Sequence, residues 1–216
     1  MGSNYEKQVF GARDIFLRYD QQTLLERYDL EYDEKYLYIE LLKKKYRIDR
    51  KTGEVQAECG RTLEDGNGAE WYETCLDFLV VMTIYAVLCY PQGKPALAGE
   101  WCQLASLQMT GSSPSQEPFL RASAGKFSGR VSELKAALEW LGGKEQAVPA
   151  SADACFLLPL FSFFPVLFQF WDGDEEFAPS ITILWDKNSL KFMHFETLYY
   201  VTNHLMERLE DLMGSK

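Results

Sequence analysis

Residues 155–186 read CFLLPLFSFFPVLFQFWDGDEEFAPSITILWD, and this stretch decides the fold of the C-terminal half of the chain. The first part is apolar and aromatic but is interrupted by Pro159 and Pro165, which is typical of two buried strands or of one strand with an irregular start. It opens into an acidic turn and returns as a short apolar segment that ends at Asp186. We therefore expect neighbouring buried strands joined by the acidic turn.

The acidic turn places four carboxylates in the five residues 172–176. As a simple turn it is ordinary, because Asp and Gly suit turn geometry and the glutamates would be solvated. As a site, Asp174 and Glu176 would lie on the same side of an extended chain and bind a cation or a ligand amine, with Asp186 of the next strand completing the site. A calcium loop of the EF-hand type is not supported, since its sixth position would be Phe177 and its twelfth Ile183.

Aromatic side chains and a histidine extend the candidate site. Trp171 and Trp185 flank the turn at strand ends and would form the walls of a ligand pocket, or they belong to the core. His194 precedes the last predicted helix and is either a ligand or base near Asp186 or a helix-start residue. The candidate ligand-binding residues are Trp171, Asp172, Asp174, Glu176, Phe177, Trp185, Asp186 and His194.

Length and charge limit the possible partners. A chain of 216 residues that is 47% hydrophobic can bury a large core, so we expect a single domain. The net charge of −10 repels phosphate backbones and anionic membrane surfaces, which predicts neither nucleic acid nor membrane as a partner. The nucleic-acid expectation would fail only if Lys43-Lys44-Lys45, predicted at an exposed hairpin turn, belongs to a larger basic patch.

The cysteines predict the redox state of the compartment, and the apolar runs predict whether the chain crosses a membrane. Five cysteines without any Cys-x-x-Cys spacing give no zinc or iron–sulfur pattern and favour a reduced, cytoplasmic location. Residues 76–90 are too few to span a bilayer, and the run at 154–171 is broken by its prolines.

The remaining pattern predicts an α+β fold. Residues 4–28 indicate one or two amphipathic helices, residues 36–56 a small antiparallel meander, and residues 70–90 a buried helix. Residues 92–129 are rich in Gly, Ser and Pro and are expected to be irregular and loop-rich. A helix is predicted at 131–141 with Gly142 as its C-terminal cap, and a terminal amphipathic helix at 195–213.

Several motifs together resemble a known family. They are Leu97-Ala98-Gly99-Glu100-Trp101, Leu141-Gly142-Gly143, the pattern Trp171-x-Gly173-Asp174-x-Glu176-Phe177, and Ile183-Leu184-Trp185-Asp186. From Tyr28 to the C-terminus the chain is similar to a prokaryotic family known only as domain of unknown function 3786. It departs from that family at Phe177-Ala178-Pro179 and Trp185-Asp186, where Phe-Pro and Phe-Asp are usual. The resemblance implies a soluble protein, mostly of anaerobic bacteria and archaea, with an association to redox or corrinoid-linked metabolism.

Three function classes follow from these observations. No Gly-x-Ser-x-Gly elbow, phosphate loop or dinucleotide fingerprint is present in the sequence, which favours a ligand-binding or accessory protein. A structural or protein-interaction domain is the alternative. The third class is a metal-assisted enzyme with Asp174, Glu176 and Asp186 as ligands and His194 as an optional further ligand. The partner would be a small molecule or a protein, and the sequence specifies no metal, cofactor or reaction.

Overall fold

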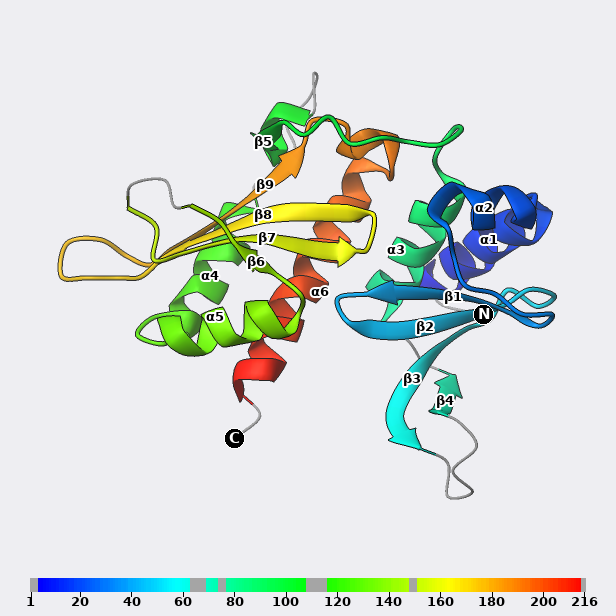
Figure 1. The fold of residues 1–216 in the computed structure, drawn as a ribbon, viewed down its shortest axis with the longest axis horizontal. Coiled ribbons are helices and arrows are strands. Elements are labelled where there is room, and N and C mark those ends of the chain that lie inside the picture. Colours follow the sequence, from blue (N-terminus) through cyan, green and yellow to red (C-terminus); the bar gives the residue numbers. More distant parts are fainter. Residues whose placement is uncertain (1–3, 63–68, 74–76, 108–115, 148–150, 215–216) are drawn as a thin grey trace. The chain divides into compact units, whose positions relative to one another are not determined.

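The computed structural model describes residues 4–62, 69–73, 77–107, 116–147 and 151–214 (Figure 1). They form two compact units, which we describe separately. Unit 1 comprises Met1–Pro95 and Lys191–Val201, and unit 2 comprises Ala96–Leu190 and Thr202–Lys216. Each unit contains an antiparallel sheet and packed helices, which confirms the α+β class; the single-domain organisation stays a prediction.

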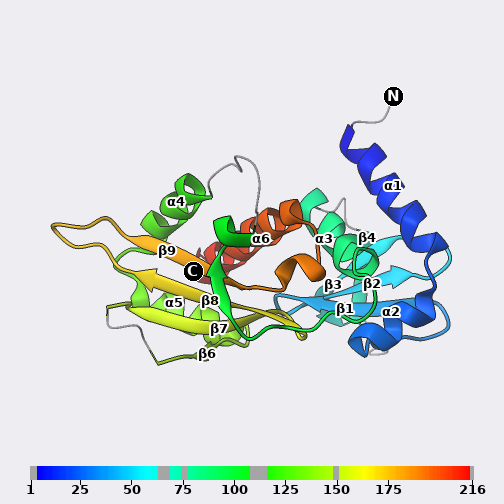
Figure 2. The same cartoon turned by 90° about the horizontal axis from the view of Figure 1, so that it is seen from above.

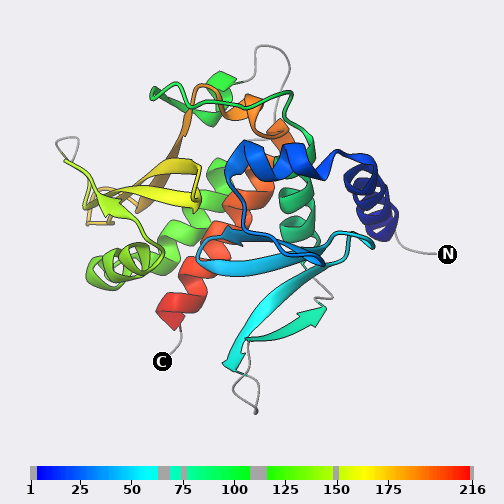
Figure 3. The same cartoon turned by 45° about the vertical axis from the view of Figure 1, so that its right-hand side comes forward.

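Unit 1 is built on a four-stranded antiparallel sheet, drawn in blue to cyan in Figure 3. The strands are β1 (Tyr36–Leu41), β2 (Lys44–Asp49), β3 (Val55–Thr62) and β4 (Ala69–Glu73), paired in that order. Side chains alternate between the two faces: Leu37 and Ile39 are buried, whereas Tyr36 and Tyr38 are partly exposed. The predicted meander is therefore confirmed and gains a fourth strand.

The predicted helix over residues 70–90 is corrected at its start. Residues 69–73 form β4, and the helix α3 (Phe78–Cys89) begins after its N-cap Asp77, whose side chain accepts a hydrogen bond from the N–H of Leu79 at 3.0 Å. The apolar content of residues 70–90 suits a strand and a buried helix equally, so periodicity alone could not separate them.

Two helices at the N-terminus, as predicted, precede the sheet: α1 (Asn4–Arg18) and α2 (Gln21–Tyr28). Helix α2 binds the C-terminus of α3 through two adjacent side chains. The buried Arg27 donates from Nη1 to the carbonyl of Leu88 at 2.7 Å, and the Tyr28 hydroxyl donates to the carbonyl of Val87 at 3.1 Å. These carbonyls have no acceptor role inside the helix, so Arg27 and Tyr28 satisfy them, and the cation faces the negative helix end.

Unit 2 is built on a five-stranded antiparallel sheet in the order β5-β9-β8-β7-β6. Figure 2 shows β9, β8, β7 and β6 side by side. The strands are β5 (Trp101–Gln103), β6 (Lys144–Glu145), β7 (Ala154–Phe161), β8 (Phe164–Trp171) and β9 (Ser180–Asp186). Phe156, Phe168 and Ile183 lie in one cross-strand row and are all buried. Pro159 and Pro165 face each other at the end of the β7–β8 hairpin, so the two missing N–H donors fall at one place in the ladder.

Helices cover the sheet of unit 2, and one of them corrects the sequence prediction. Within residues 92–129, which we expected to be irregular, Glu117–Phe127 form helix α4, and β5 and the short helix η1 (Leu104–Leu107) precede it. Leu120, Ala124 and Phe127 are buried along one side of α4, so tertiary packing outweighs the unfavourable Gly125, while Pro118 lies in the first turn, where proline is tolerated. Residues 108–115 of this segment lie outside the described residues.

The next helix is α5 (Val131–Trp140), which, like α4, lies along the sheet in Figure 1. Gly142 follows it with a φ of 84°, which confirms the predicted left-handed cap. The chain ends with η2 (Ser189–Lys191) and the terminal helix α6 (Phe195–Gly214), which contributes its first residues to unit 1 and the remainder to unit 2.

No helix in the described part of the chain has the length and apolar character needed to span a membrane. Cys89, Cys102 and Cys155 are free thiols, whereas the side chains of Cys59 and Cys75 are not described.

The two-residue turn between β1 and β2 is strained. It consists of Leu42 and Lys43, with φ values of 49° and 59°. Of the lysine trio, Lys43 lies in the predicted hairpin turn, and Lys44 and Lys45 begin β2. Positive φ at both positions suits Asn-Gly turns, whereas it costs an L-residue with a Cβ roughly 1–2 kcal/mol. Leu42 is fully buried, so replacing it would cost packing energy. Lys43 is exposed, so a substitution there can relieve the backbone strain without loss of core contacts.

We predict that Lys43→Gly raises the free energy of unfolding by about 0.5 kcal/mol, because relief of strain exceeds the entropy that glycine adds to the unfolded chain. Urea unfolding followed by circular dichroism measures it. Lys45→Gly is the matched control, since Lys45 is an exposed residue of an extended strand, where glycine destabilises. Equal destabilisation by both substitutions would contradict the prediction.

Candidate functional site

The carboxylate of Asp172, at the start of the acidic turn, ties the end of β8 to the connection between α4 and α5. It accepts hydrogen bonds from the Ser128 hydroxyl at 2.8 Å, the Gly129 N–H at 2.9 Å and the Gly173 N–H at 2.8 Å. Burial raises the pKa of Asp172, but the bonds from Gly129, Ser128 and Gly173 outweigh it, so the pKa is lowered overall. Asp172 therefore acts as an anchor between backbone segments.

Asp174 organises the turn itself. Its Oδ1 accepts hydrogen bonds from the N–H groups of Glu176 at 2.8 Å and Phe177 at 2.7 Å, and these bonds lower the pKa of Asp174. These bonds fit the simple-turn alternative of the sequence analysis, and not the extended chain in which Asp174 and Glu176 would face one ligand together. Glu176 is exposed and so is Phe177, at 69% of its surface.

Asp186 lies at the opposite end of β9 from the turn. Trp171, next to the turn, pairs with Ser180 at the start of β9. Asp186 lies six positions further along the strand, which corresponds to about 20 Å. The Asp186 side chain is fully buried, and its oxygens accept N–H bonds from Ala98 at 2.9 Å, Gly99 at 2.7 Å and Asn188 at 2.8 Å. The expected constellation of Asp174, Glu176 and Asp186 is therefore not formed.

The two tryptophans are also separated. Trp185 is 1% exposed and packs in the core beside Phe164, with 6.3 Å between ring centroids. Trp171 is half-buried, and its Nε1 donates to the Ser151 hydroxyl at 3.2 Å. They do not form two walls of one pocket.

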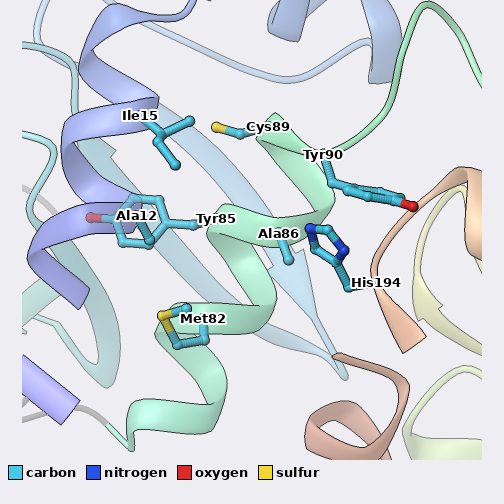
Figure 4. A pocket seen from close by; sticks show the side chains of 8 residues that line it. All are labelled: Ala12, Ile15, Met82, Tyr85, Ala86, Cys89, Tyr90 and His194. Carbon is cyan, nitrogen blue, oxygen red and sulfur yellow. The ribbon is translucent and has the colours of Figure 1, made fainter. Parts of the chain in front are cut away.

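His194 belongs to unit 1, where it precedes helix α6 and lines a pocket. Its carbonyl accepts the N–H of Thr197 at 3.0 Å, as expected for a residue at a helix start. Its exposed imidazole lies against the Tyr90 ring, with 3.8 Å between ring centroids (Figure 4). Of the predicted site residues, only His194 lines this pocket.

The pocket has a volume of about 190 Å³ and lies between α1 and α3. Figure 4 shows the side chains that line it, which are Ala12, Ile15, Met82, Tyr85, Ala86, Cys89, Tyr90 and His194. All except His194 present mainly apolar atoms or aromatic rings. An apolar cavity of about 150 Å³ holds benzene, so this pocket has room for one substituted ring or a short alkyl chain.

The Cys89 thiol and the Tyr85 hydroxyl near the pocket are both protonated at neutral pH. Burial raises the pKa of the Cys89 thiol to about 12, despite the opposing charge of Arg27, so the thiol stays protonated at neutral pH. Burial likewise raises the pKa of the Tyr85 hydroxyl, which donates to the carbonyl of Gly53. Cys89 and Tyr85 are therefore walls of the pocket, and the imidazole of His194 is its one basic group.

One signal in the sequence points to this pocket. Helix α3 reads FLVVMTIYAVLC and has no polar face, so apolar side chains remain on the side that does not meet the sheet. Met82, Ala86 and Cys89 follow helical spacing on that side, and all three are half-exposed.

Residues 20–208 match the family described as Domain of unknown function (DUF3786). The chain belongs to this family. No curated protein and no solved structure matches it.

Two motifs by which the chain resembled the DUF3786 family meet in unit 2. The segment 97–101 reaches Asp186 through the N–H groups of Ala98 and Gly99, and Trp101 pairs with Asp186 across β5 and β9. Gly99 has a φ of 72°, a conformation that favours glycine and places its N–H on the carboxylate. These motifs are therefore structural in this member of the family.

We predict that Asp186→Ala lowers the free energy of unfolding by about 3 kcal/mol, because three N–H donors lose a charged acceptor. Guanidinium unfolding measures this change. Asp174→Ala is the control, since it removes an exposed carboxylate that serves only its own turn, and its loss should be much smaller. The anchoring role is wrong if the two substitutions cost the same.

Asp172 predicts a dependence of stability on pH. Its folded-state pKa lies below the unfolded value of about 3.9, so its contribution is complete above that pH and is lost as the pH falls through the folded pKa. Asp172→Asn should lower the free energy of unfolding at pH 7 by about 1 kcal/mol. Its unfolding midpoint should then fall less steeply than the wild type between about pH 4 and pH 2. Parallel curves for the two proteins would refute this role.

Proposed function

We propose that the protein is a ligand-binding protein whose pocket between α1 and α3 takes a small apolar molecule carrying one hydrogen-bonding group. The observation that carries this proposal is the apolar pocket of about 190 Å³ with a single imidazole, that of His194. A neutral imidazole both donates and accepts hydrogen bonds, so a phenol, indole or short alcohol matches this chemistry.

The size of the pocket sets the class of ligand. Pockets for drug-sized molecules measure roughly 300–1,000 Å³, so this one suits a ligand of about one ring. Apolar walls from Ile15, Met82 and Tyr85 supply non-directional binding energy, and His194 supplies selectivity for one polar substituent.

Catalysis by the acidic turn is not favoured. Asp172 and Asp174 are engaged by backbone N–H groups of their own unit, and Asp186 is buried at the other end of β9. The protonated thiol of Cys89 gives the pocket no nucleophile at neutral pH. We infer a binding role from these features.

Exposed apolar residues on α1 favour one alternative, a protein-interaction role. Helix α1 buries Phe16 but leaves Tyr5, Phe10 and Ile15 more than half exposed. Light scattering distinguishes this role, since Phe10→Glu would dissolve an assembly that depends on α1 and leave ligand binding in the pocket unchanged.

We predict saturable binding of 4-methylphenol and indole, measured by ligand-observed NMR and by the melting temperature of the full chain. Ala86→Leu should abolish binding, because the larger side chain fills the pocket. The matched control is Ala122→Leu, which enlarges an exposed alanine of α4 and should leave binding intact.

A second substitution tests the imidazole. His194→Phe keeps a ring in place and should weaken 4-methylphenol roughly tenfold, which corresponds to the loss of one hydrogen bond. Toluene should bind both proteins equally. The proposal fails if none of these ligands binds the wild type, or if Ala86→Leu binds them unchanged.

A further inference from the structure

The β1–β2 hairpin concentrates basic residues in an acidic chain. Residues 35–51 contain seven Lys or Arg and two Asp or Glu, a net charge of 7 − 2 = +5, whereas the whole chain carries −10. The basic residues are Lys35, Lys43, Lys44, Lys45, Arg47, Arg50 and Lys51. The lysine trio lies at the turn of the hairpin, whereas Lys35, Arg50 and Lys51 lie at its other end, beside Arg47.

Aromatic rings surround one of these cations on the partly exposed face of the sheet. The guanidinium carbon of Arg47 lies 3.9 Å from the ring centroid of Tyr36 and 4.5 Å from that of Trp71. Tyr38 contacts both rings, with centroid distances of 6.4 Å to Tyr36 and 6.0 Å to Trp71. We call Tyr36, Tyr38, Arg47, Gln56 and Trp71 the Arg47 platform.

The platform holds its guanidinium in a fixed orientation. Arg47 Nε donates to Gln56 Oε1 at 2.7 Å, and the rings of Tyr36 and Trp71 pack against the guanidinium. Among the described residues, none accepts a hydrogen bond from its two Nη groups. A guanidinium that is fixed in this way, with four N–H groups available, is suited to bind an anion through two parallel bonds.

A second cation lies at the same ring. Lys35 Nζ is 4.9 Å from the centroid of Tyr36, so two positive charges share one aromatic ring. Asp33 near Arg47 and Asp49 near Lys35 neutralise part of this positive charge. An anion bound beside the two cations would form charge-assisted hydrogen bonds with both. The half-buried rings of Tyr38 and Trp71 offer apolar surface next to this position.

We propose that the Arg47 platform binds one planar aromatic molecule that carries a phosphate, such as a nucleoside monophosphate. The ring stacks on Tyr38 and Trp71, and the phosphate binds Arg47 and Lys35. Several carboxylates surround the platform: Asp33 accepts a hydrogen bond from the hydroxyl of Tyr38, and Glu40, Asp49 and Glu58 share this face of the sheet. A single phosphate therefore fits better than a nucleic-acid strand, whose further phosphates these carboxylates would repel. The site uses the sheet, not the pocket between α1 and α3.

Calorimetry of the full chain with adenosine monophosphate tests the proposal. Adenosine supplies the ring without the phosphate, and inorganic phosphate supplies the anion without the ring. We expect adenosine monophosphate to bind at least tenfold more tightly than either fragment. A twelve-residue oligodeoxythymidine should bind no more tightly than the mononucleotide.

Three substitutions locate the site. Arg47→Gln should weaken adenosine monophosphate at least tenfold with little effect on adenosine, and Trp71→Leu should weaken both, while Trp71→Phe retains binding. The matched control is Lys51→Gln, which removes the same charge from an exposed residue outside the platform. Ala86→Leu, which fills the α1–α3 pocket, should leave nucleotide binding unchanged, so the two sites are tested independently.

Absence of binding at millimolar adenosine monophosphate overturns the proposal. So does equal weakening by Arg47→Gln and Lys51→Gln, which would mean non-specific attraction to charge. Tight binding of the oligonucleotide would reassign this face to single-stranded nucleic acid. Circular dichroism of each variant keeps the result interpretable, since a variant that has lost its fold is replaced by Arg47→Lys, which keeps the charge but loses the two parallel bonds.

Discussion

A carboxylate that is removed from water must find donors, and the fully buried Asp186 satisfies this constraint with three backbone N–H groups. Two of them come from residues almost ninety positions earlier in the chain, so this one side chain fixes the segment before β5 against the end of β9. The Glu100–Lys187 ion pair and the bond from Asn188 to the carbonyl of Ala96 follow from the same alignment. The short strand β5 then covers one edge of the sheet of unit 2, which would otherwise present unpaired backbone groups.

Hydrophobic periodicity and turn residues in the sequence predicted those helices and strands that depend on interactions between near neighbours in the chain. The apolar runs around Pro159 and Pro165, the meander at 36–56 and the terminal helix were all evident, because hydrophobic periodicity and turn chemistry act over a few residues. Helix α4 was missed because residues 92–129 are rich in Gly, Ser and Pro, although Pro118 suits the first turn of a helix. Burial of Leu120 and Phe127 compensates for Gly125 inside the helix. The roles of the acidic residues were also missed. Whether a carboxylate binds a ligand or a distant N–H depends on tertiary contacts, and Asp172 and Asp186 do the latter.

The two proposed sites of unit 1 would bind their ligands through different interactions. The pocket between α1 and α3 excludes polar groups except His194, so its selectivity comes from shape and from one hydrogen bond. In the Arg47 platform, aromatic neighbours hold one charged group, the Arg47 guanidinium. Its selectivity would come from electrostatics and stacking, and anion binding there would weaken as the salt concentration increases. Neither site includes Asp172 or Asp186, which hold backbone segments of unit 2 together.

Unit 1 is discontinuous in the chain, since its last piece, Lys191–Val201, follows most of unit 2. This order matters on the ribosome. Tyr90 and His194 line the same pocket, yet 104 residues separate them, which at ordinary rates of synthesis corresponds to roughly 5–20 s. During that interval α1 and α3 have been made but the wall formed by His194 has not. The nascent protein thus passes through a stage in which the apolar surface of α3 is not yet covered by His194. A ligand or a chaperone present at that stage would find a wider opening than in the complete protein.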